Sequence, residues 1–117
     1  GVYHFKNAED FIHDYLYPQE NGNRCDVRWL EVGSDVKLRV DAVGRAFEAS
    51  VHPYTLEELD AAKHSCDLPR HDYLTVNIDG GQQGVGGDVP AVATLKPQYK
   101  LPKMQTLTLR CALQFKK

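Results

Sequence analysis

The chain carries its most chemically suggestive residues in loops, and the first is the glycine-crowded stretch GVGGDVPAVATL at 84–95. A loop that cradles phosphate needs glycines leading into a helix N-terminus, and the nucleotide-binding patterns add Lys with Ser or Thr, or a third glycine. Here the third glycine is replaced by Val89, and Pro90 does not begin a helix. Nucleotide binding is therefore disfavoured, and composition alone favours a sharp bend between strands.

A second loop, PQENG at 18–22, presents Glu20 and Asn21, and Arg24 follows it closely. These three side chains could hydrogen-bond a ligand. However, Asn-Gly is a common turn dipeptide, and paired surface charges such as Arg24 with Asp26 are more often solvated than functional. The chemistry favours a turn, with ligand contact as the alternative.

A third set has the side-chain types that bind zinc, namely His64, Cys66, His71 and Asp72. Their spacing fits no compact ligand pattern, so we predict no metal site. The chain also lacks a convincing pair of residues for general acid and base catalysis, which disfavours an independent enzyme.

The elements that must position these loops are mostly strands. VKLRVDAV at 36–43 alternates apolar and charged residues, which predicts a strand with one wet face. RCDVRWL at 24–30 alternates in the same way with Trp29 inward in the core, and Gly33-Ser34-Asp35 separates the two as a hairpin would. AFEASV at 46–51 offers Phe47, Ala49 and Val51 on one side. Three short strands in succession predict an antiparallel meander.

Only one segment argues strongly for a helix. Thr55 and Glu58 form a capping box, which predicts a short helix over 56–64.

YLTVNID at 73–79 and QTLTLRCALQF at 105–115 predict two further strands, the second with its alternate apolar residues inward (Leu107, Leu109, Cys111, Leu113 and Phe115). The opening segment 7–18 suits both a strand and a helix capped by Asn7. Six or so strands around one helix predict an all-β, mainly antiparallel sandwich.

Composition limits the partners. The 117 residues fit one domain, and 14 basic against 16 acidic residues give a net charge of −2 with no basic block. Nucleic acid and membrane are thus not expected as partners, and no apolar run reaches the length of a bilayer span. The three cysteines, Cys25, Cys66 and Cys111, leave at least one thiol free without a second chain, which mildly favours a reducing compartment.

Four blocks of the sequence resemble one family in order and spacing. They are PQENGNRCDVRWLEV at 18–32, HPYTLEELDAAKHSCDLPRHD at 52–72, NIDGGQQGVGGD at 77–88 and PQYKL at 97–101. Together they resemble the C-terminal small-chain region, domain 5, of the large LacZ-type β-galactosidases of glycoside hydrolase family 2. The resemblance covers 1–117. It implies a single domain that is the final part of a galactose-mutarotase-like β supersandwich placed after a catalytic barrel.

The resemblance also implies where the chemistry lies. Retaining glycosidases use two carboxyl groups, and in the family both project from the barrel, so no catalytic residue is expected here. The Mg and Na ions of the parent enzyme are bound elsewhere in the family, and no cofactor or metal is expected in this segment.

The family supplies one wall of the substrate pocket through a tryptophan shortly after the Gly-Gly-Asp loop, which stacks on the sugar. In this sequence Ala91 stands at the tryptophan position, and Val89 and Pro90 replace an acidic or amide residue and a serine. The resemblance thus implies a pocket rim of Gly87, Asp88, Val89 and Ala91 without the stacking platform. Glu20, Asn21 and Arg24 are the candidates for a secondary loop.

The function implied is that of a non-catalytic segment of an enzyme that hydrolyses terminal β-galactosides, where it shapes the active-site wall and supports assembly. The alternative is a free-standing carbohydrate-binding or assembly module of the same fold. The expected partners are the upstream catalytic barrel and a galactoside substrate, and a homo-oligomer is also compatible with the resemblance. Because strands of the sandwich would be missing, we expect exposed sheet edges to self-associate. A cytoplasmic location is favoured, although a periplasmic or exported one is also compatible.

Overall fold

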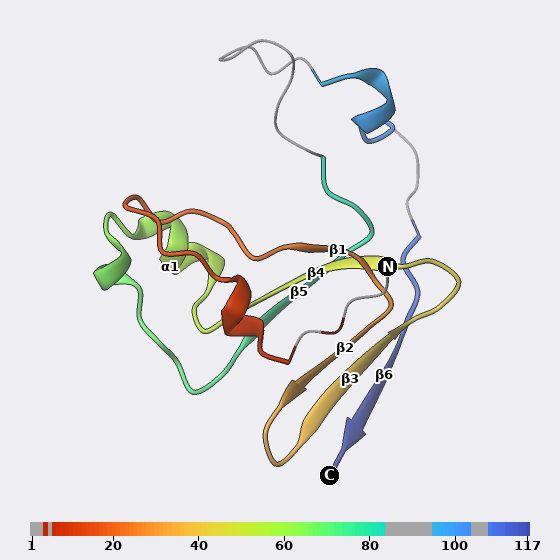
Figure 1. Ribbon diagram of the computed structural model, residues 1–117, viewed down its shortest axis with the longest axis horizontal. Coiled ribbons are helices and arrows are strands. Elements are labelled where there is room, and N and C mark those ends of the chain that lie inside the picture. Colours follow the sequence, from red (N-terminus) through yellow and green to blue (C-terminus); the bar gives the residue numbers. More distant parts are fainter. Residues whose placement is uncertain (1–3, 5, 84–94, 104–107) are drawn as a thin grey trace. The chain divides into compact units, whose positions relative to one another are not determined.

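The computed structural model describes residues 4, 6–83, 95–103 and 108–117. Over this part of the chain it is built from β-strands joined by loops, with a single short α-helix and three 3-10 helices (Figure 1). The predicted all-β class is confirmed. Its residues form two compact units, the first from the residues up to Arg24 with Ala49–Ile78, and the second from Cys25–Glu48 with the remainder. The assignment of the whole chain to one domain stays a prediction.

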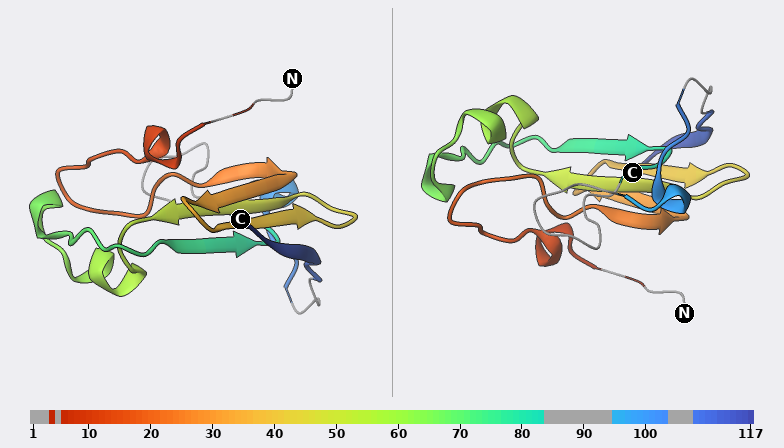
Figure 2. Two further views of the ribbon diagram at one scale, coloured as in Figure 1. Left: turned by 90° about the horizontal axis from the view of Figure 1, so that it is seen from below. Right: turned by 90° about the horizontal axis from the view of Figure 1, so that it is seen from above.

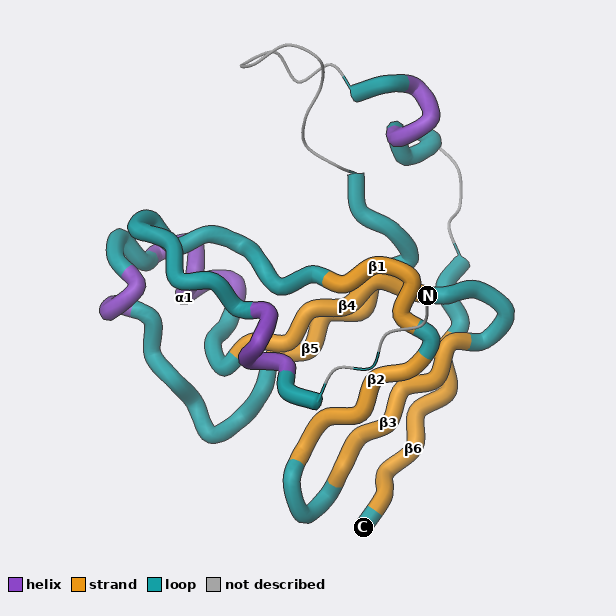
Figure 3. The backbone as a smooth tube through the Cα atoms, in the orientation of Figure 1, coloured by secondary structure: helices purple, strands orange, loops and turns teal. Residues whose placement is uncertain are grey.

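One antiparallel sheet has the order β2-β3-β6, where β2 is Trp29–Gly33, β3 is Lys37–Ala42 and β6 is Cys111–Lys116. Gly33 pairs with Lys37 at the end of the β2–β3 ladder, so the predicted hairpin is confirmed. The strands lie side by side in Figure 3, and Val40 of β3 pairs with Leu30 on one side and Leu113 on the other.

The two faces of this sheet differ sharply in character, because directly paired residues share a face. One face is apolar and is made by Leu30, Val32, Leu38, Val40, Ala42, Cys111, Leu113 and Phe115. The other is largely charged and is made by Trp29, Glu31, Gly33, Lys37, Arg39, Asp41, Ala112, Gln114 and Lys116. The alternation predicted for residues 36–43 is therefore confirmed.

Coverage of the apolar face is uneven. Val40 is fully buried, but Leu113 and Phe115 are exposed, Phe115 by 79%. The prediction that alternate residues of the last strand point inward is therefore wrong for Cys111, Leu113 and Phe115 in this structure. Alternation tells which residues share a face, but it does not tell whether another layer covers that face.

The second sheet has the order β1-β4-β5, where β1 is Arg24–Val27, β4 is Phe47–His52 and β5 is Thr75–Asp79 (Figure 2). Its central strand β4 contains the buried residues Phe47, Ala49, Ser50, Val51 and His52. The predicted inward side is confirmed, and on the opposite side Ser50 and His52 are buried as well, whereas Glu48 is half-buried. The predicted meander is wrong beyond the hairpin, because β4 joins β1 and β5 rather than β3.

The predicted strand over 24–30 is divided. β1 ends at Val27 and β2 begins at Trp29, so the alternating run contributes to two sheets. Within it Asp26 has φ 56°, a left-handed conformation that aspartate adopts more readily than most residues. Trp29 is 45% exposed, so its assignment to the core is wrong. The Arg39 guanidinium lies 4.7 Å from the centre of its ring instead.

The helix α1 covers Leu56–Ala61, and its capping box is confirmed. The Glu58 backbone N–H donates to Thr55 Oγ1 at 3.2 Å, and the Thr55 N–H donates to Glu58 Oε2 at 2.8 Å. The predicted end at residue 64 is wrong, because the Asp67 carboxylate accepts from the backbone N–H groups of Lys63 and His64 and opens the 3-10 helix Ser65–Asp67.

Two further 3-10 helices cover Ala8–Phe11 and Pro97–Tyr99. Of the two alternatives left open for 7–18, the helix is present only as the short 3-10 turn Ala8–Phe11, and the Asn7 side chain before it forms no cap hydrogen bond. No helix in the described parts of the chain is long and apolar enough to cross a bilayer.

Candidate functional site

The residues predicted to rim the pocket, Gly87, Asp88, Val89 and Ala91, lie outside the described residues. Glu20, Asn21 and Arg24 are described, and they adjoin a loop formed by His13–Gln19, which we call the clip loop. The candidate site consists of this loop together with the buried residues beneath it. All of it belongs to the first compact unit.

Asn21 closes the base of the clip loop. Its Oδ1 accepts from the His13 backbone N–H at 3.0 Å, and its Nδ2 donates to the carbonyls of His13 at 3.3 Å and Gln19 at 3.0 Å. The amide is therefore engaged by both ends of the loop, and its role here is structural. Next to it Gly22 has φ +77°, in the left-handed region that favours glycine.

Arg24 packs on the protein rather than reaching outward. Its guanidinium carbon lies 3.5 Å from the centre of the Phe11 ring, and Nη1 donates to the Asn23 carbonyl at 2.7 Å. Glu20 is exposed. The structure thus brings Asn21 to the loop base and Arg24 to Phe11, and it does not assemble the three predicted residues around one shared point.

His52 is the most deeply buried ionisable residue described, with 1% of its surface exposed. Neither ring nitrogen has a hydrogen-bond partner of good geometry. Burial lowers the pKa of His52, and the nearby Glu20 charge and Asn21 backbone oppose this only in part. The imidazole is therefore neutral near pH 7.

Tyr54 stacks on His52 with ring centres 5.2 Å apart and is itself buried. Burial, followed by the Asp14 charge, raises the pKa of the Tyr54 phenol. Its hydroxyl therefore stays protonated at neutral pH and remains both a donor and an acceptor.

A small cavity of about 70 Å³ lies under the clip loop. Its walls come from 12–15, Pro18, Gln19 and Asn21 on the loop side, and from Pro53, Tyr54, Leu59, Ser65, Leu68 and Arg70 on the other. This volume admits a few water-sized molecules and is far below the several hundred Å³ of pockets that enclose a whole ligand. The cavity is polar enough for water but too small for a sugar ring.

The histidines of zinc-ligand type belong to two separate pairs. His71 Nε2 lies 2.8 Å from Glu58 Oε1, and His64 Nδ1 lies 3.5 Å from Asp67 Oδ2. The Thr55 backbone N–H, followed by His71, lowers the pKa of Glu58. Among the described residues no group of three or more His, Cys, Asp or Glu side chains could hold a metal ion.

Sequence reasoning missed His52, Tyr54 and the closure of the clip loop. No sequence signal marked His52 as buried, because it shares its side of FEASVH with Glu48 and Ser50, a pattern typical of a strand with one solvent-facing side. The Asn21 contacts reach back eight residues to His13, and no local pattern predicts such a pairing.

The chain is similar in sequence to one family model and to several beta-galactosidases. The sequence model of a family described as beta galactosidase small chain matches residues 1–113. The beta-galactosidase BgaC of Bifidobacterium adolescentis is 36% identical over 111 residues, 92% of this chain and 11% of that protein. The beta-galactosidase of Halalkalibacterium halodurans is 39% identical over 106 residues, 88% of this chain and 10% of that protein.

The beta-galactosidase of Vibrio cholerae is 40% identical over 99 residues, covering 82% of this chain and 9% of that protein. The chain thus spans about a tenth of the length of the curated relatives it matches.

Proposed function

The chain belongs to the beta galactosidase small chain family, and from this premise we propose that it is the non-catalytic C-terminal segment of an enzyme hydrolysing terminal β-galactosides. In that role it forms part of a mutarotase-like supersandwich, provides part of the active-site wall and supports assembly with the catalytic barrel of the same polypeptide. The observation that carries the proposal is a family match over 1–113, combined with relatives about ten times longer.

Three of the described carboxyl groups are unsuited to act as the acid of a glycosidase. The Arg39 hydrogen bond lowers the pKa of Asp41, and backbone N–H donors at Thr55 and His64 lower those of Glu58 and Asp67. These groups stay ionised at neutral pH, whereas the acid of a glycosidase must carry a proton. We assign the catalytic carboxyl groups and the Mg and Na ions to the rest of the enzyme.

A chimera tests this proposal. The matching segment of the Bifidobacterium adolescentis enzyme is replaced by residues 1–117, and hydrolysis of a nitrophenyl β-galactoside is compared with that of the same enzyme truncated before the segment. We expect the chimera to be active and the truncated enzyme to be inactive. A folded chimera without activity, or hydrolysis by the 117-residue chain alone, contradicts the proposal. Glycan binding by that chain alone would instead favour the free-standing carbohydrate-binding module.

The wall role makes a prediction at Ala91, where the resemblance expects a stacking tryptophan. In the full-length enzyme Ala91→Trp should tighten binding of lactose or glucose, because the indole offers an apolar face to the C–H side of a sugar ring. Ala91→Val is the matched control, since it adds volume without a ring. Unchanged Michaelis and inhibition constants in the tryptophan variant would remove the basis for placing this loop at the substrate.

A further inference from the structure

The clip loop is held in one shape by contacts at its base and along its side. Asn21 joins both ends of the loop through three hydrogen bonds. The Ser65 hydroxyl donates to the Tyr15 carbonyl at 2.6 Å, and Pro18 is buried. The backbone of the loop is thus held by Ser65 of the 3-10 helix Ser65–Asp67 and by Asn21, which follows its C-terminal end.

The tip of this fixed loop is apolar and open to solvent. Leu16 is 93% exposed and Tyr17 64% exposed, and Tyr15 beside them is also exposed. A single exposed leucine needs no explanation. Three adjacent large side chains on a loop whose ends are tied together do need one, because burying them would have been favourable and the fold instead holds them outward.

Such a tip has the properties of a binding anchor. Tyrosine is one of the residue types that contribute most to the binding free energy at interfaces, and an anchor already fixed in its bound shape loses little entropy on docking. The clip loop satisfies both conditions, since its contacts to Asn21 and Ser65 are made within the protein before any partner arrives.

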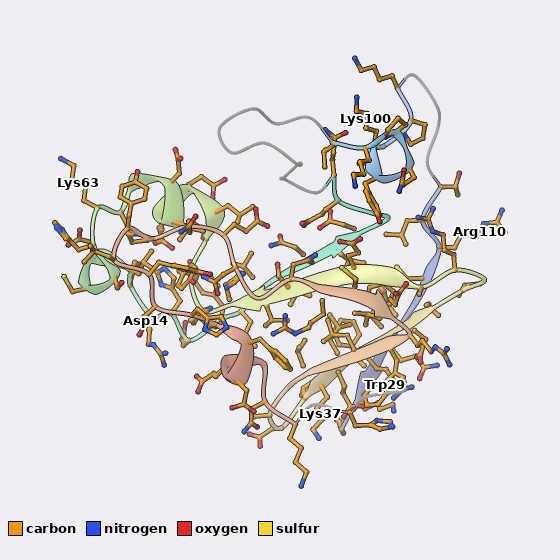
Figure 4. The ribbon with its side chains drawn as sticks, turned by 45° about the horizontal axis from the view of Figure 1, so that its top comes forward. Asp14, Trp29, Lys37, Lys63, Lys100 and Arg110 are labelled. Carbon is orange, nitrogen blue, oxygen red and sulfur yellow. The ribbon has the colours of Figure 1, made fainter. Side chains whose placement is uncertain are left out.

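The partner's chemistry follows from what surrounds the tip. Asp14 lies within the loop and Glu20 follows its C-terminal end; both are exposed, and Asp14 is marked in Figure 4. A complementary surface would therefore have an apolar pocket with lysine or arginine at its edge. The relatives are about ten times longer than this chain, so a large protein surface of the same polypeptide is available for this role.

We propose that the tip residues Tyr15, Leu16 and Tyr17 dock into a basic-edged apolar pocket on the part of the β-galactosidase polypeptide that lies outside this segment. The inference rests on the proposed function, and it adds the surface through which the segment attaches. Tyr15 also lines the small cavity beneath the loop, but the proposal assigns no partner group to that cavity or to the buried His52.

The first test introduces charge at the tip of the chimera defined above. Leu16→Asp combined with Tyr17→Asp should reduce activity at least about tenfold, or lower the temperature of half-inactivation, because a hydrophobic anchor is lost. The matched control is Leu56→Asp, which changes an exposed leucine at the first turn of α1, where an acidic residue is tolerated. Loop variants that behave like the control overturn the docking proposal.

The second test measures protection of the tip directly and does not depend on activity. In a chimera whose Cys25, Cys66 and Cys111 are replaced by serine, Leu16→Cys should react with a maleimide at least about tenfold more slowly than Leu56→Cys, because a docked thiol is inaccessible. Equal rates overturn the proposal. Protection that disappears on dilution would point to a second copy and would also overturn it. An inactive chimera with a protected tip counts against the proposed function alone.

Discussion

The burial of His52 disfavours the protonated, charged form of its imidazole. Its imidazole is enclosed, stacks on Tyr54 and finds no hydrogen-bond partner of good geometry. A buried polar group in this state costs free energy, yet the neutral ring still contributes packing. The fold therefore favours the neutral imidazole and resists its protonation.

The preference for the neutral imidazole predicts a loss of stability in acid. The pKa of His52 is lowered by burial below its ordinary value of 6.5, so the unfolded chain binds the proton more readily than the folded chain. Its contribution is complete above pH 6.5 and is lost as the pH falls from there through the lowered folded pKa. His52→Phe should leave the free energy of unfolding at pH 7.5 within about 1 kcal/mol and reduce its decline by pH 5. Denaturant titrations at the two pH values measure this, and identical declines would show that His52 is not the cause.

Trp29 shows that the alternation of apolar and polar residues does not determine on which sheet face a residue lies. Its position in the run RCDVRWL groups it with Cys25 and Val27. In the structure, however, β1 ends at Val27, and Trp29 begins β2, where it lies on the charged face of the β2-β3-β6 sheet. The Trp29 and Lys37 side chains, both labelled in Figure 4, come from neighbouring strands of that sheet. A single left-handed residue, Asp26, lies within this run, and sequence periodicity cannot register it.

At the scale of elements, the β2–β3 hairpin depends on Gly33. It has φ +120°, and a Cβ there would overlap the Val36 carbonyl oxygen. Gly44 offers a matched comparison, because it has φ +82° and nothing lies within 4 Å of the position that a Cβ would take. The two sites share an unfavourable φ for other residues, and only the first adds a steric clash.

Gly33→Ala should therefore destabilise the chain more than Gly44→Ala, by at least about 1 kcal/mol in the free energy of unfolding. The clash must be relieved by moving backbone atoms of the turn, whereas Gly44→Ala carries the conformational cost alone. Denaturant unfolding of the two variants side by side provides the measurement. Equal losses would mean that the turn at 34–36 relaxes freely around an added methyl group.

The sequence patterns were informative about which elements exist and less so about how they pair. Alternation in VKLRVDAV and the capping box at Thr55 predicted β3 and α1, because both signals are local. The membership of β4 in the sheet with β1 and β5, and not in that of β3, depends on pairing between strands that are distant in sequence. The candidate site followed the same rule, since the Asn21 and Ser65 contacts join residues up to fifty positions apart.

At the scale of the whole molecule, the sheet formed by β2, β3 and β6 has an apolar face that is open at Leu113 and Phe115. The strand order places β6 at an edge of that sheet among the described strands. An open edge next to exposed apolar side chains favours pairing with another chain. In the parent enzyme proposed above, further protein would be available to cover this surface.

The isolated chain should therefore self-associate as its concentration rises. Replacing Leu113 and Phe115 with threonine keeps strand propensity while removing apolar surface, so this variant should shift the association to higher concentration. Val43→Thr is the control, because Val43 is exposed but lies outside the strands. Static light scattering against concentration measures the effect, and a clean monomer at high concentration would contradict the expectation.

The three cysteines all lie in described parts of the chain, all are exposed and none forms a disulfide, in agreement with the prediction of at least one free thiol. Exposed thiols oxidise in air and join molecules through intermolecular disulfides, independently of any strand pairing. A preparation kept without reductant would therefore contain covalently linked species that dilution cannot separate. Electrophoresis with and without a thiol reductant distinguishes these species from reversible complexes. Replacing Cys66 or Cys111 singly with serine would show which of the two thiols forms more of the intermolecular disulfides.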